Sequence, residues 1–278
     1  MKHLFLNLIL GLVFFSCTSN HQQSEITPSP TLPTTKHTEA SQKVTTLIPE
    51  LIQFPSLDGL TITANLYHHN DESPIVLLCH QAGYNKFEYN EIAKTLFDKG
   101  YNCIAIDQRS GGQLEDSFNE TFIEAEKEGL PTAYLDAKQD IDAALDFAYS
   151  KYNRKVILWG SSYSSSLALY IAGNQTNLEA VIAFSPGNYF VEQAYDLKTR
   201  IAKIDIPMFI TSSKSEAVEL SDILTDITLK ENQIQFTPLA KGKHGSKALW
   251  KSHENHTEYW KAILNFLNGI KKTSSANE

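Results

Sequence analysis

Cysteine is scarce in this sequence, which has three cysteines among 278 residues. Three cysteines cannot hold a chain of this length together by disulfide bonds, so a disulfide-rich scaffold is excluded. Long basic runs are absent as well, because no run of lysine or arginine exceeds the two residues of Lys271–Lys272, and the formal net charge is -8. An acidic chain of this kind has little with which to bind phosphate backbones, so nucleic acid is not an expected partner.

Metal-ligand spacings are also missing. The histidines and cysteines form neither a His-Glu-x-x-His nor a Cys-x-x-Cys motif, so we expect no metal ion and no other cofactor. What the chain does contain is 42% hydrophobic and 20% charged residues, which is the composition of a globular protein. Residues 48–278 are enough for one well-buried domain.

The amino terminus is typical of a secretory signal peptide. Residues 1–16 contain one cationic residue, Lys2, then the apolar run LFLNLILGLVFF, and then the small residue Ser16. The apolar run is short for a transmembrane helix. Because Cys17 follows the predicted cleavage position, the segment resembles a bacterial lipoprotein signal, which implies that Cys17 carries a diacylglycerol. We therefore expect the chain in the cell envelope, anchored in a membrane; the alternative is an ordinary signal peptide with an incidental cysteine.

Residues 17–47 are predicted to be a linker that follows the lipid anchor. Fifteen of the thirty residues from 18 to 47 are serine, threonine or proline, and the apolar residues show no regular period. Such a segment cannot bury enough apolar surface to offset its ordering entropy, so we expect it to be disordered. At ~3.1 Å per residue in its Pro-rich part, it would reach up to about 90 Å from a membrane surface.

The remaining residues predict one α/β domain. Residues 51–67 contain two alternating runs separated by Asp58-Gly59, which favours a hairpin. Short apolar runs then alternate with amphipathic stretches over residues 88–98, 134–152 and 259–270, which predict helices. Strands that are apolar on both faces belong to parallel sheets covered by helices, so we expect a doubly wound, mostly parallel sheet of about eight strands. The apolar runs are Ile75–Cys79, Cys103–Ile106, Val156–Trp159, Ala180–Phe184, Pro207–Ile210 and Ile234–Phe236.

Two cysteines fall inside these predicted strands. Cys79 ends one strand and Cys103 begins the next. If the two strands end level with each other, the sulfur atoms are about four residues, or ~13 Å, out of register. A disulfide needs Cα atoms within about 7 Å, so we expect both thiols to be reduced and part of the core.

One serine lies where a strand turns directly into a helix. The run Val156–Trp159 continues into Gly160-Ser161-Ser162-Tyr163-Ser164 and then into a helical stretch, which places Ser162 in a G-x-S-x-small pattern. Small residues two positions before and after allow a turn so tight that the serine backbone is strained and its hydroxyl projects from the sheet. The alternative is that Ser162 only caps the helix, since several serines adjoin it.

With this motif the sequence resembles the α/β-hydrolase superfamily, over nearly all of residues 50–270. The resemblance implies the chain order nucleophile, acid, histidine, with Ser162 as nucleophile, Glu216 as acid and His244 as general base. Glu216 follows the run Pro207–Ile210, and His244 lies in the loop KGKHG after Ile234–Phe236. Ser164 stands where the family has a second glycine.

Alternatives remain for two of these positions. Glu216 is not the commoner aspartate and its turn lacks the family's glycine, which leaves Glu219 and Asp222 as further candidates for the acid. His253 and His256 compete with His244 for the role of base, but they lie at or just before the last predicted helix.

The resemblance also implies a site that stabilises an oxyanion. The segment Cys79-His80-Gln81-Ala82-Gly83 stands where the family has a His-Gly-x motif. The backbone N–H groups of Tyr163 and Ala82, with Gln81 as second choice, are therefore the expected donors, each worth ~3 kcal/mol of transition-state stabilisation. His80 is expected to be structural, and so are Asp107 and Arg109 in the turn that follows the second apolar run.

The segment from residue 186 to residue 206 has no room for the helical cap that larger family members carry there. The chain is therefore similar to small lidless ester hydrolases of the dienelactone-hydrolase-like kind, which implies cleavage of a carboxylic ester through an acyl-enzyme. An amide or peptide substrate, or a binding protein without catalysis, are the alternatives. Residues 113–132 are an additional segment that we expect to line the mouth of the site.

Overall fold

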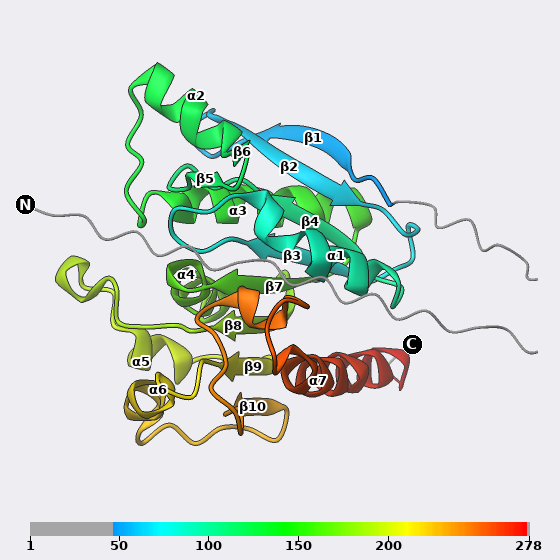
Figure 1. Cartoon of the computed structure of the whole chain (residues 1–278), viewed down its shortest axis with the longest axis vertical. Coiled ribbons are helices and arrows are strands. Elements are labelled where there is room, and N and C mark those ends of the chain that lie inside the picture. Colours follow the sequence, from blue (N-terminus) through cyan, green and yellow to red (C-terminus); the bar gives the residue numbers. More distant parts are fainter. Residues whose placement is uncertain (1–46, 277–278) are drawn as a thin grey trace, which may run out of the picture. The chain divides into compact units, whose positions relative to one another are not determined.

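The computed structural model describes residues 47–276 of the chain (Figure 1). The predicted signal peptide, Cys17 and all but the last residue of the predicted linker lie outside these residues. No helix within the described part of the chain is both long enough and apolar enough to cross a membrane.

Within residues 47–276, one eight-stranded sheet forms the centre of the fold, in the order β1-β2-β4-β3-β7-β8-β9-β10. β1 and β2 form an antiparallel hairpin, β2 is also antiparallel to β4, and the other neighbours are parallel. This arrangement confirms the predicted mostly parallel sheet. The strands are β1 (Glu50–Pro55), β2 (Thr61–Tyr67), β3 (Ile75–Cys79), β4 (Asn102–Ile106), β7 (Val156–Ser161), β8 (Leu178–Phe184), β9 (Met208–Thr211) and β10 (Gln233–Phe236).

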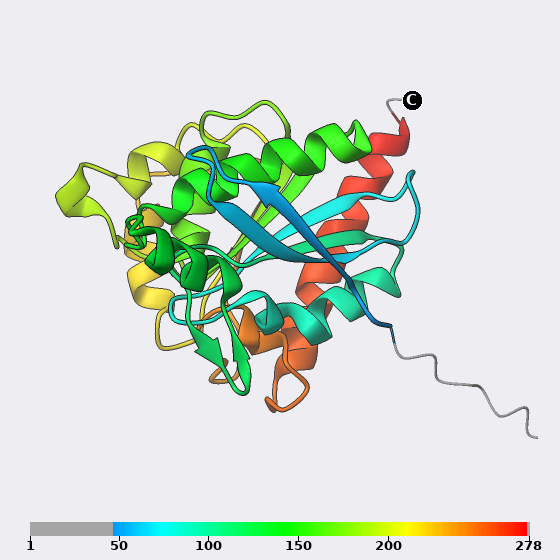
Figure 2. The ribbon, with the colours of Figure 1, turned by 90° about the horizontal axis from the view of Figure 1, so that it is seen from above.

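Helices cover both faces of the sheet. The face that presents Leu77 packs against α3, α4, α5 and α6, while the face that presents Leu78 packs against α1 and α7. Figure 2 shows α3, in green, and α7, in red, on opposite sides of the sheet. The helices are η1 (Lys86–Tyr89), α1 (Asn90–Phe97), α2 (Glu120–Glu128), α3 (Ala137–Tyr152), α4 (Tyr163–Ala172), η2 (Val191–Gln193), α5 (Leu197–Ile201), α6 (Ala217–Leu224), η3 (Ser246–Leu249) and α7 (His256–Ala276).

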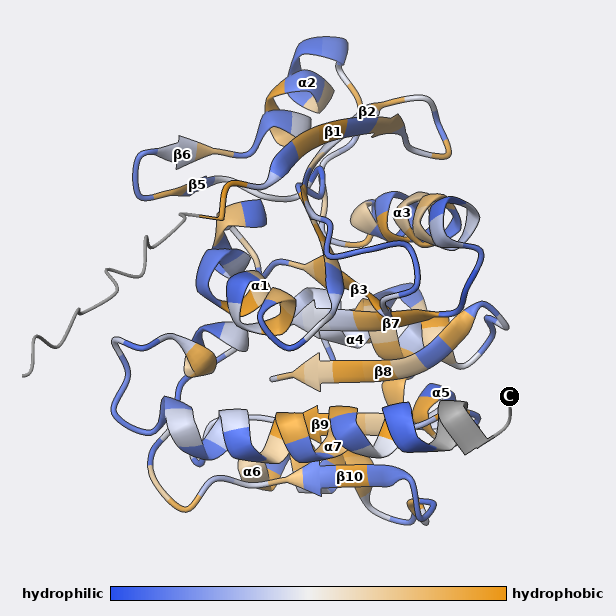
Figure 3. Ribbon diagram, turned by 90° about the vertical axis from the view of Figure 1, so that its right-hand side faces the viewer, coloured by the Kyte–Doolittle hydropathy of each residue, from blue (hydrophilic) through white to orange (hydrophobic). Residues whose placement is uncertain are grey.

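The central strands are apolar on both faces because both faces are covered. Every residue of β3, β4 and β7 is buried, and Figure 3 shows hydrophobic colour along β8 and β9. Burial of this kind contributes about 25 cal/mol for each Å² of apolar surface removed from water. A strand with one face in water would instead alternate between apolar and polar residues.

Two helix boundaries differ from the sequence prediction. The predicted helix at residues 88–98 begins as the 3-10 helix η1 and becomes α-helical at Asn90. The helix predicted from Tyr134 begins at Ala137, because Asp136 Oδ2 accepts a hydrogen bond from the Ala133 N–H and holds residues 133–136 in a turn. Apolar periodicity does not detect such a turn.

The two core cysteines are free and buried, as predicted. In the parallel pair of β3 and β4, Cys103 lies opposite Val76, whereas Cys79 lies opposite Ile106. The offset is three residues, or about 10 Å, rather than the four residues expected from sequence. It is still too long for a disulfide.

Candidate active site

Ser162 occupies a strained turn between β7 and α4. Its φ is 58° and its ψ is -126°, a left-handed conformation that costs a serine free energy and that surrounding contacts must hold in place. The Ser162 N–H donates to the Phe184 carbonyl at 2.8 Å. A Cβ at Gly160 would lie 2.4 Å from the carbonyl oxygen of Ser164, so the turn closes only because residue 160 has no side chain. The strain is what the G-x-S-x-small pattern predicts.

The structure brings Ser162, His244 and Glu216 into one chain of hydrogen bonds. His244 Nε2 lies 2.7 Å from Ser162 Oγ, and His244 Nδ1 lies 2.6 Å from Glu216 Oε1. A carboxylate at Nδ1 keeps the imidazole proton there, so that Nε2 accepts from the serine hydroxyl. The His244 side chain is 37% exposed, so the array is open to solvent on one side.

The other candidates for acid and base do not join this array. Glu219 and Asp222 lie on α6, which begins one residue after Glu216, and within the described residues neither makes a hydrogen bond to His244. His256 Nδ1 instead pairs with the His253 carbonyl at the start of α7.

Glu216 is held as a carboxylate. Burial opposes its ionisation, but hydrogen bonds from His244, from the Ser213 N–H at 3.0 Å and from Ser185 Oγ at 2.8 Å lower the pKa of Glu216 to about 2. At neutral pH the group is therefore charged. A charged carboxylate stabilises the imidazolium that forms when His244 takes a proton.

Two backbone N–H groups near Ser162 are available for an oxyanion. Tyr163 N is at the first position of α4, where helical geometry provides no partner, and within residues 47–276 neither Tyr163 N nor Ala82 N has a hydrogen-bond acceptor. The second-choice donor, Gln81, is less suited to this role. Its N–H donates to Glu88 Oε2 at 2.7 Å, so it is already bound to a buried carboxyl.

His80 orients the loop that carries Ala82. Its Nε2 accepts from the Gln108 N–H at 3.0 Å, which leaves the proton on Nδ1 to donate to the Gln81 carbonyl at 2.8 Å. Burial lowers the pKa of His80, and with both ring nitrogens engaged the residue is neutral. His80 is therefore structural here, as expected.

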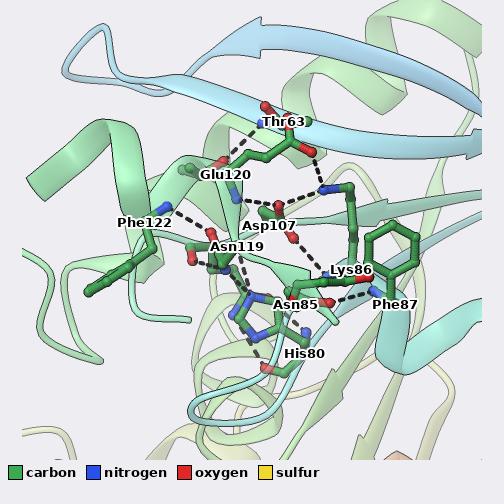
Figure 4. Close-up of polar contacts among 12 residues, drawn as sticks. Thr63, His80, Asn85, Lys86, Phe87, Asp107, Asn119, Glu120 and Phe122 are labelled. Atoms are coloured by element: carbon green, nitrogen blue, oxygen red, sulfur yellow. Dashed lines mark hydrogen bonds and ion pairs between the residues drawn. The ribbon is translucent and has the colours of Figure 1, made fainter. Parts of the chain in front are cut away.

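A polar cluster, buried except for the half-exposed Glu120 side chain, holds residues 113–132 against the carboxyl edge of the sheet. Lys86 Nζ contacts Asp107 Oδ2 at 2.8 Å and Glu120 Oε1 at 2.9 Å, and Asp107 Oδ2 also accepts from the Glu120 N–H at 2.9 Å (Figure 4). Asn119 caps α2 by accepting from the Phe122 N–H. Four polar side chains thus hold the start of α2 against the ends of β3 and β4.

The segment 113–132 contains the small hairpin of β5 (Gln113–Leu114) and β6 (Ser117–Phe118) before α2. Leu114 and Ser117 line a pocket of about 200 Å³ together with Glu88 and Trp250. Ser162 is not part of that pocket's lining. The segment therefore lies at the expected edge of the sheet, but the pocket that it lines does not contain the serine.

Aromatic side chains contact the residues next to the serine turn. The Tyr134 ring lies 4.7 Å from the ring of Tyr163, the residue after Ser162, and the Tyr189 hydroxyl donates to the Ser185 carbonyl at 3.4 Å. Tyr134 and Tyr189 are 47% and 46% exposed. An apolar group of a bound molecule can stack on these rings.

Sequence reasoning missed two serines that hold the loop after His244. The Gly245 N–H donates to Ser185 Oγ at 2.9 Å, and the Ser246 N–H donates to Ser161 Oγ at 2.8 Å. Ser185 has a φ of 54°, which is the strained left-handed region. The partners are 60 and 85 residues apart in the chain, and only their motif positions after strand ends could have pointed to them.

The array fits proton transfer from a hydroxyl to an imidazole, followed by attack on a carbonyl carbon. Within the described residues, no group of three or more His, Cys, Asp or Glu side chains is placed to hold a metal ion.

Comparison with known proteins identifies similar chains. Residues 70–244 match the model of a family described as serine aminopeptidase, S33. The AB hydrolase superfamily protein YfhM of Bacillus subtilis is 27% identical over 238 residues, which cover 81% of this chain and 75% of that protein. Other curated relatives are matched over less than half of their own length.

Solved structures with the same fold include an esterase of Pyrococcus furiosus and a dienelactone hydrolase of Anabaena variabilis. The esterase has a TM-score of 0.59 at 15% identity, over 79% of this chain and 91% of that chain. The dienelactone hydrolase has a TM-score of 0.53 at 17% identity, over 70% of this chain and 88% of that chain. At these identities the likeness concerns the fold.

Proposed function

Because the chain belongs to the serine aminopeptidase S33 family of α/β hydrolases, we propose that it is a serine hydrolase that cleaves a carboxylic ester. The observation that supports this most directly is the continuous hydrogen-bonded chain from Ser162 Oγ through His244 to Glu216. A serine, an imidazole and a carboxylate in this order are the groups that acyl transfer requires.

The proposed mechanism has two halves. His244 Nε2 takes the proton of Ser162 as Oγ attacks the ester carbonyl, and the resulting oxyanion receives hydrogen bonds from Tyr163 N and Ala82 N. The imidazolium then gives its proton to the departing alcohol, which leaves an acyl-enzyme on Ser162. In the second half His244 activates water, which releases the acid. Glu216 holds the imidazole and balances its charge throughout.

An ester is proposed because, in the described part of the chain, the segment from residue 186 to residue 206 holds only the short helices η2 and α5, and because an esterase is among the structures with the same fold. The family description, serine aminopeptidase, favours an amide or peptide bond as the second candidate. Both use the same array, so substrate panels distinguish them. Faster turnover of an aminoacyl p-nitroanilide than of p-nitrophenyl esters would favour the second candidate.

The test of the chemistry uses Ser162→Ala. We expect this variant to lose turnover of p-nitrophenyl acetate and labelling by a fluorophosphonate, while its far-ultraviolet circular dichroism stays unchanged. Retained labelling would disprove the nucleophile. His244→Ala separates catalysis from a binding protein of the same fold, because only an enzyme loses activity with a folded chain.

We further propose that the chain is attached to a membrane of the cell envelope through a lipid on Cys17. The apolar run before Cys17 and the Ser-, Thr- and Pro-rich segment after it support this proposal. Cys17→Ser is expected to move the protein from the membrane fraction to the soluble fraction without changing esterase activity. A variant that still sediments with membranes would contradict the lipid anchor.

A further inference from the structure

Two hydrogen bonds hold the loop that carries His244. As described above, the N–H groups of Gly245 and Ser246 donate to the hydroxyls of Ser185 and Ser161. A hydroxyl that accepts in this way still has its own proton to donate. The acceptors of these two protons show which groups the serines connect to the loop after His244.

Each serine donates to a carboxyl group. Ser185 Oγ donates to Glu216 Oε2 at 2.8 Å, and Ser161 Oγ donates to Glu88 Oε1 at 2.7 Å. Ser185 therefore connects the loop after His244 to Glu216, the acid of the proposed array. Ser161 connects the same loop to Glu88, which the proposed mechanism does not use.

Glu88 connects the histidine loop to the oxyanion loop. Its Oε2 accepts from the Gln81 N–H at 2.7 Å, one residue before the proposed donor Ala82. Glu88 lies on η1 and is completely buried. One carboxyl group thus bonds to the segments on both sides of the position where a substrate carbonyl would lie.

Within the described residues, no cation forms an ion pair with the buried Glu88 carboxyl. The titratable groups that face it are Lys247 and His244, and neither forms an ion pair with it within the described residues. Burying a carboxyl without such a partner costs free energy. Burial also raises the pKa of Glu88 to about 7, although the hydrogen bonds from Gln81 and Ser161 oppose the shift.

We propose that Glu88 is a positioning residue, which sets the oxyanion donor Ala82 and the base His244 at their working separation through Gln81 N and Ser161 Oγ. The inference rests on the proposed hydrolase function. A displacement of about 1 Å in such an arrangement can lower the rate a hundredfold.

The test combines Glu88→Gln and Ser161→Ala. At pH 8, above the Glu88 pKa of about 7, the carboxylate accepts from the Gln81 N–H and the Ser161 O–H at 2.7 Å each and from the Gln81 side-chain amide at 3.5 Å. A glutamine at position 88 has one oxygen that can accept, which is too few for these donors. We therefore expect Glu88→Gln to lower kcat for p-nitrophenyl acetate about tenfold, with KM changed less than twofold. Glu128→Gln on the exposed surface of α2 is the matched control and should leave both constants unchanged.

The double variant tests whether Glu88 acts through Ser161. In the Ser161→Ala background the Gln81 N–H is the one close donor that remains, beside the Gln81 side-chain amide at 3.5 Å, so the single oxygen of glutamine can serve the backbone N–H. Glu88→Gln should then lower kcat less than threefold further, a non-additivity that marks two residues acting together. A tenfold loss in both backgrounds would overturn the proposal, and so would an unchanged kcat in Glu88→Gln.

These results are separable from failure of the proposed function. If Ser162→Ala retains wild-type turnover, the serine mechanism itself is wrong. If Ser162→Ala is inactive while Glu88→Gln matches wild type in kcat and KM, the mechanism stands and the role of Glu88 is refuted. A fall in kcat that follows a fall in melting temperature, with KM raised equally, would make Glu88 merely structural.

Discussion

Replacing Glu88 with glutamine should change the pH dependence of the free energy of unfolding. The pKa of Glu88 is raised from 4.5 to about 7 because the carboxyl is buried. Between these two values the folded protein keeps a proton that the unfolded chain releases, so the unfolding free energy falls as the pH rises. Glutamine does not titrate, so the unfolding free energy of the variant does not show this decrease with rising pH.

The size of the effect follows from the shift. Each pH unit between the two pKa values costs about 1.4 kcal/mol, so the window from pH 5 to pH 7 accounts for about 3 kcal/mol. Glu216 does not interfere, because its pKa of about 2 confines its contribution to pH values below 4.5, where stability is lost as the pH falls.

The assay is urea-induced unfolding followed by tryptophan fluorescence at pH 5 and pH 8. The free energy of Glu88→Gln minus that of wild type should be about 3 kcal/mol more favourable at pH 8 than at pH 5. Glu128→Gln, on an exposed face of α2, should show no such change. A difference below about 1 kcal/mol would refute the reasoning, because it would mean that residue 88 ionises as it does in water.

Three further changes test the site and its support. Gly160→Ala places a Cβ 2.4 Å from the Ser164 carbonyl oxygen, and the displaced turn should lower kcat about a hundredfold in an ester assay. Asp140→Ala removes a fully buried partner of Arg109 at 2.8 Å and should lower the unfolding free energy by about 3 to 5 kcal/mol, measured in urea; wild-type stability would contradict this. Glu216→Gln should lower kcat about a hundredfold to ten-thousandfold, because an amide does not stabilise the imidazolium, and an unchanged pH–rate profile would argue against its role.

The predicted strands agree well with the structure because burial on both faces leaves a strong signal. The run Ile75–Cys79 coincides with β3, since every residue of a central parallel strand is buried and apolar. The start of α3 was misplaced by three residues because the hydrogen bond at Asp136 that delays the helix is local and independent of periodicity.

The candidate site was predictable only where motif and chain order carry information. Ser162, Glu216 and His244 follow the ends of β7, β9 and β10, and parallel strands bring their carboxyl ends to one edge of the sheet. The sequence ranks Ala82 ahead of Gln81, but it does not show that the Gln81 N–H is bound by Glu88, because that depends on the direction in which one backbone N–H points.

The sequence by itself determined the layered α/β fold, the strained serine turn and the chain order of the three proposed catalytic residues. These features follow from hydrophobic periodicity and from a short motif, both of which are local in the chain. Only the tertiary structure decided that Glu88 lies beneath the site and bonds to both Gln81 and Ser161. A buried carboxyl is indistinguishable from a surface one in a list of residues, because its position depends on side chains that folding brings together from distant segments.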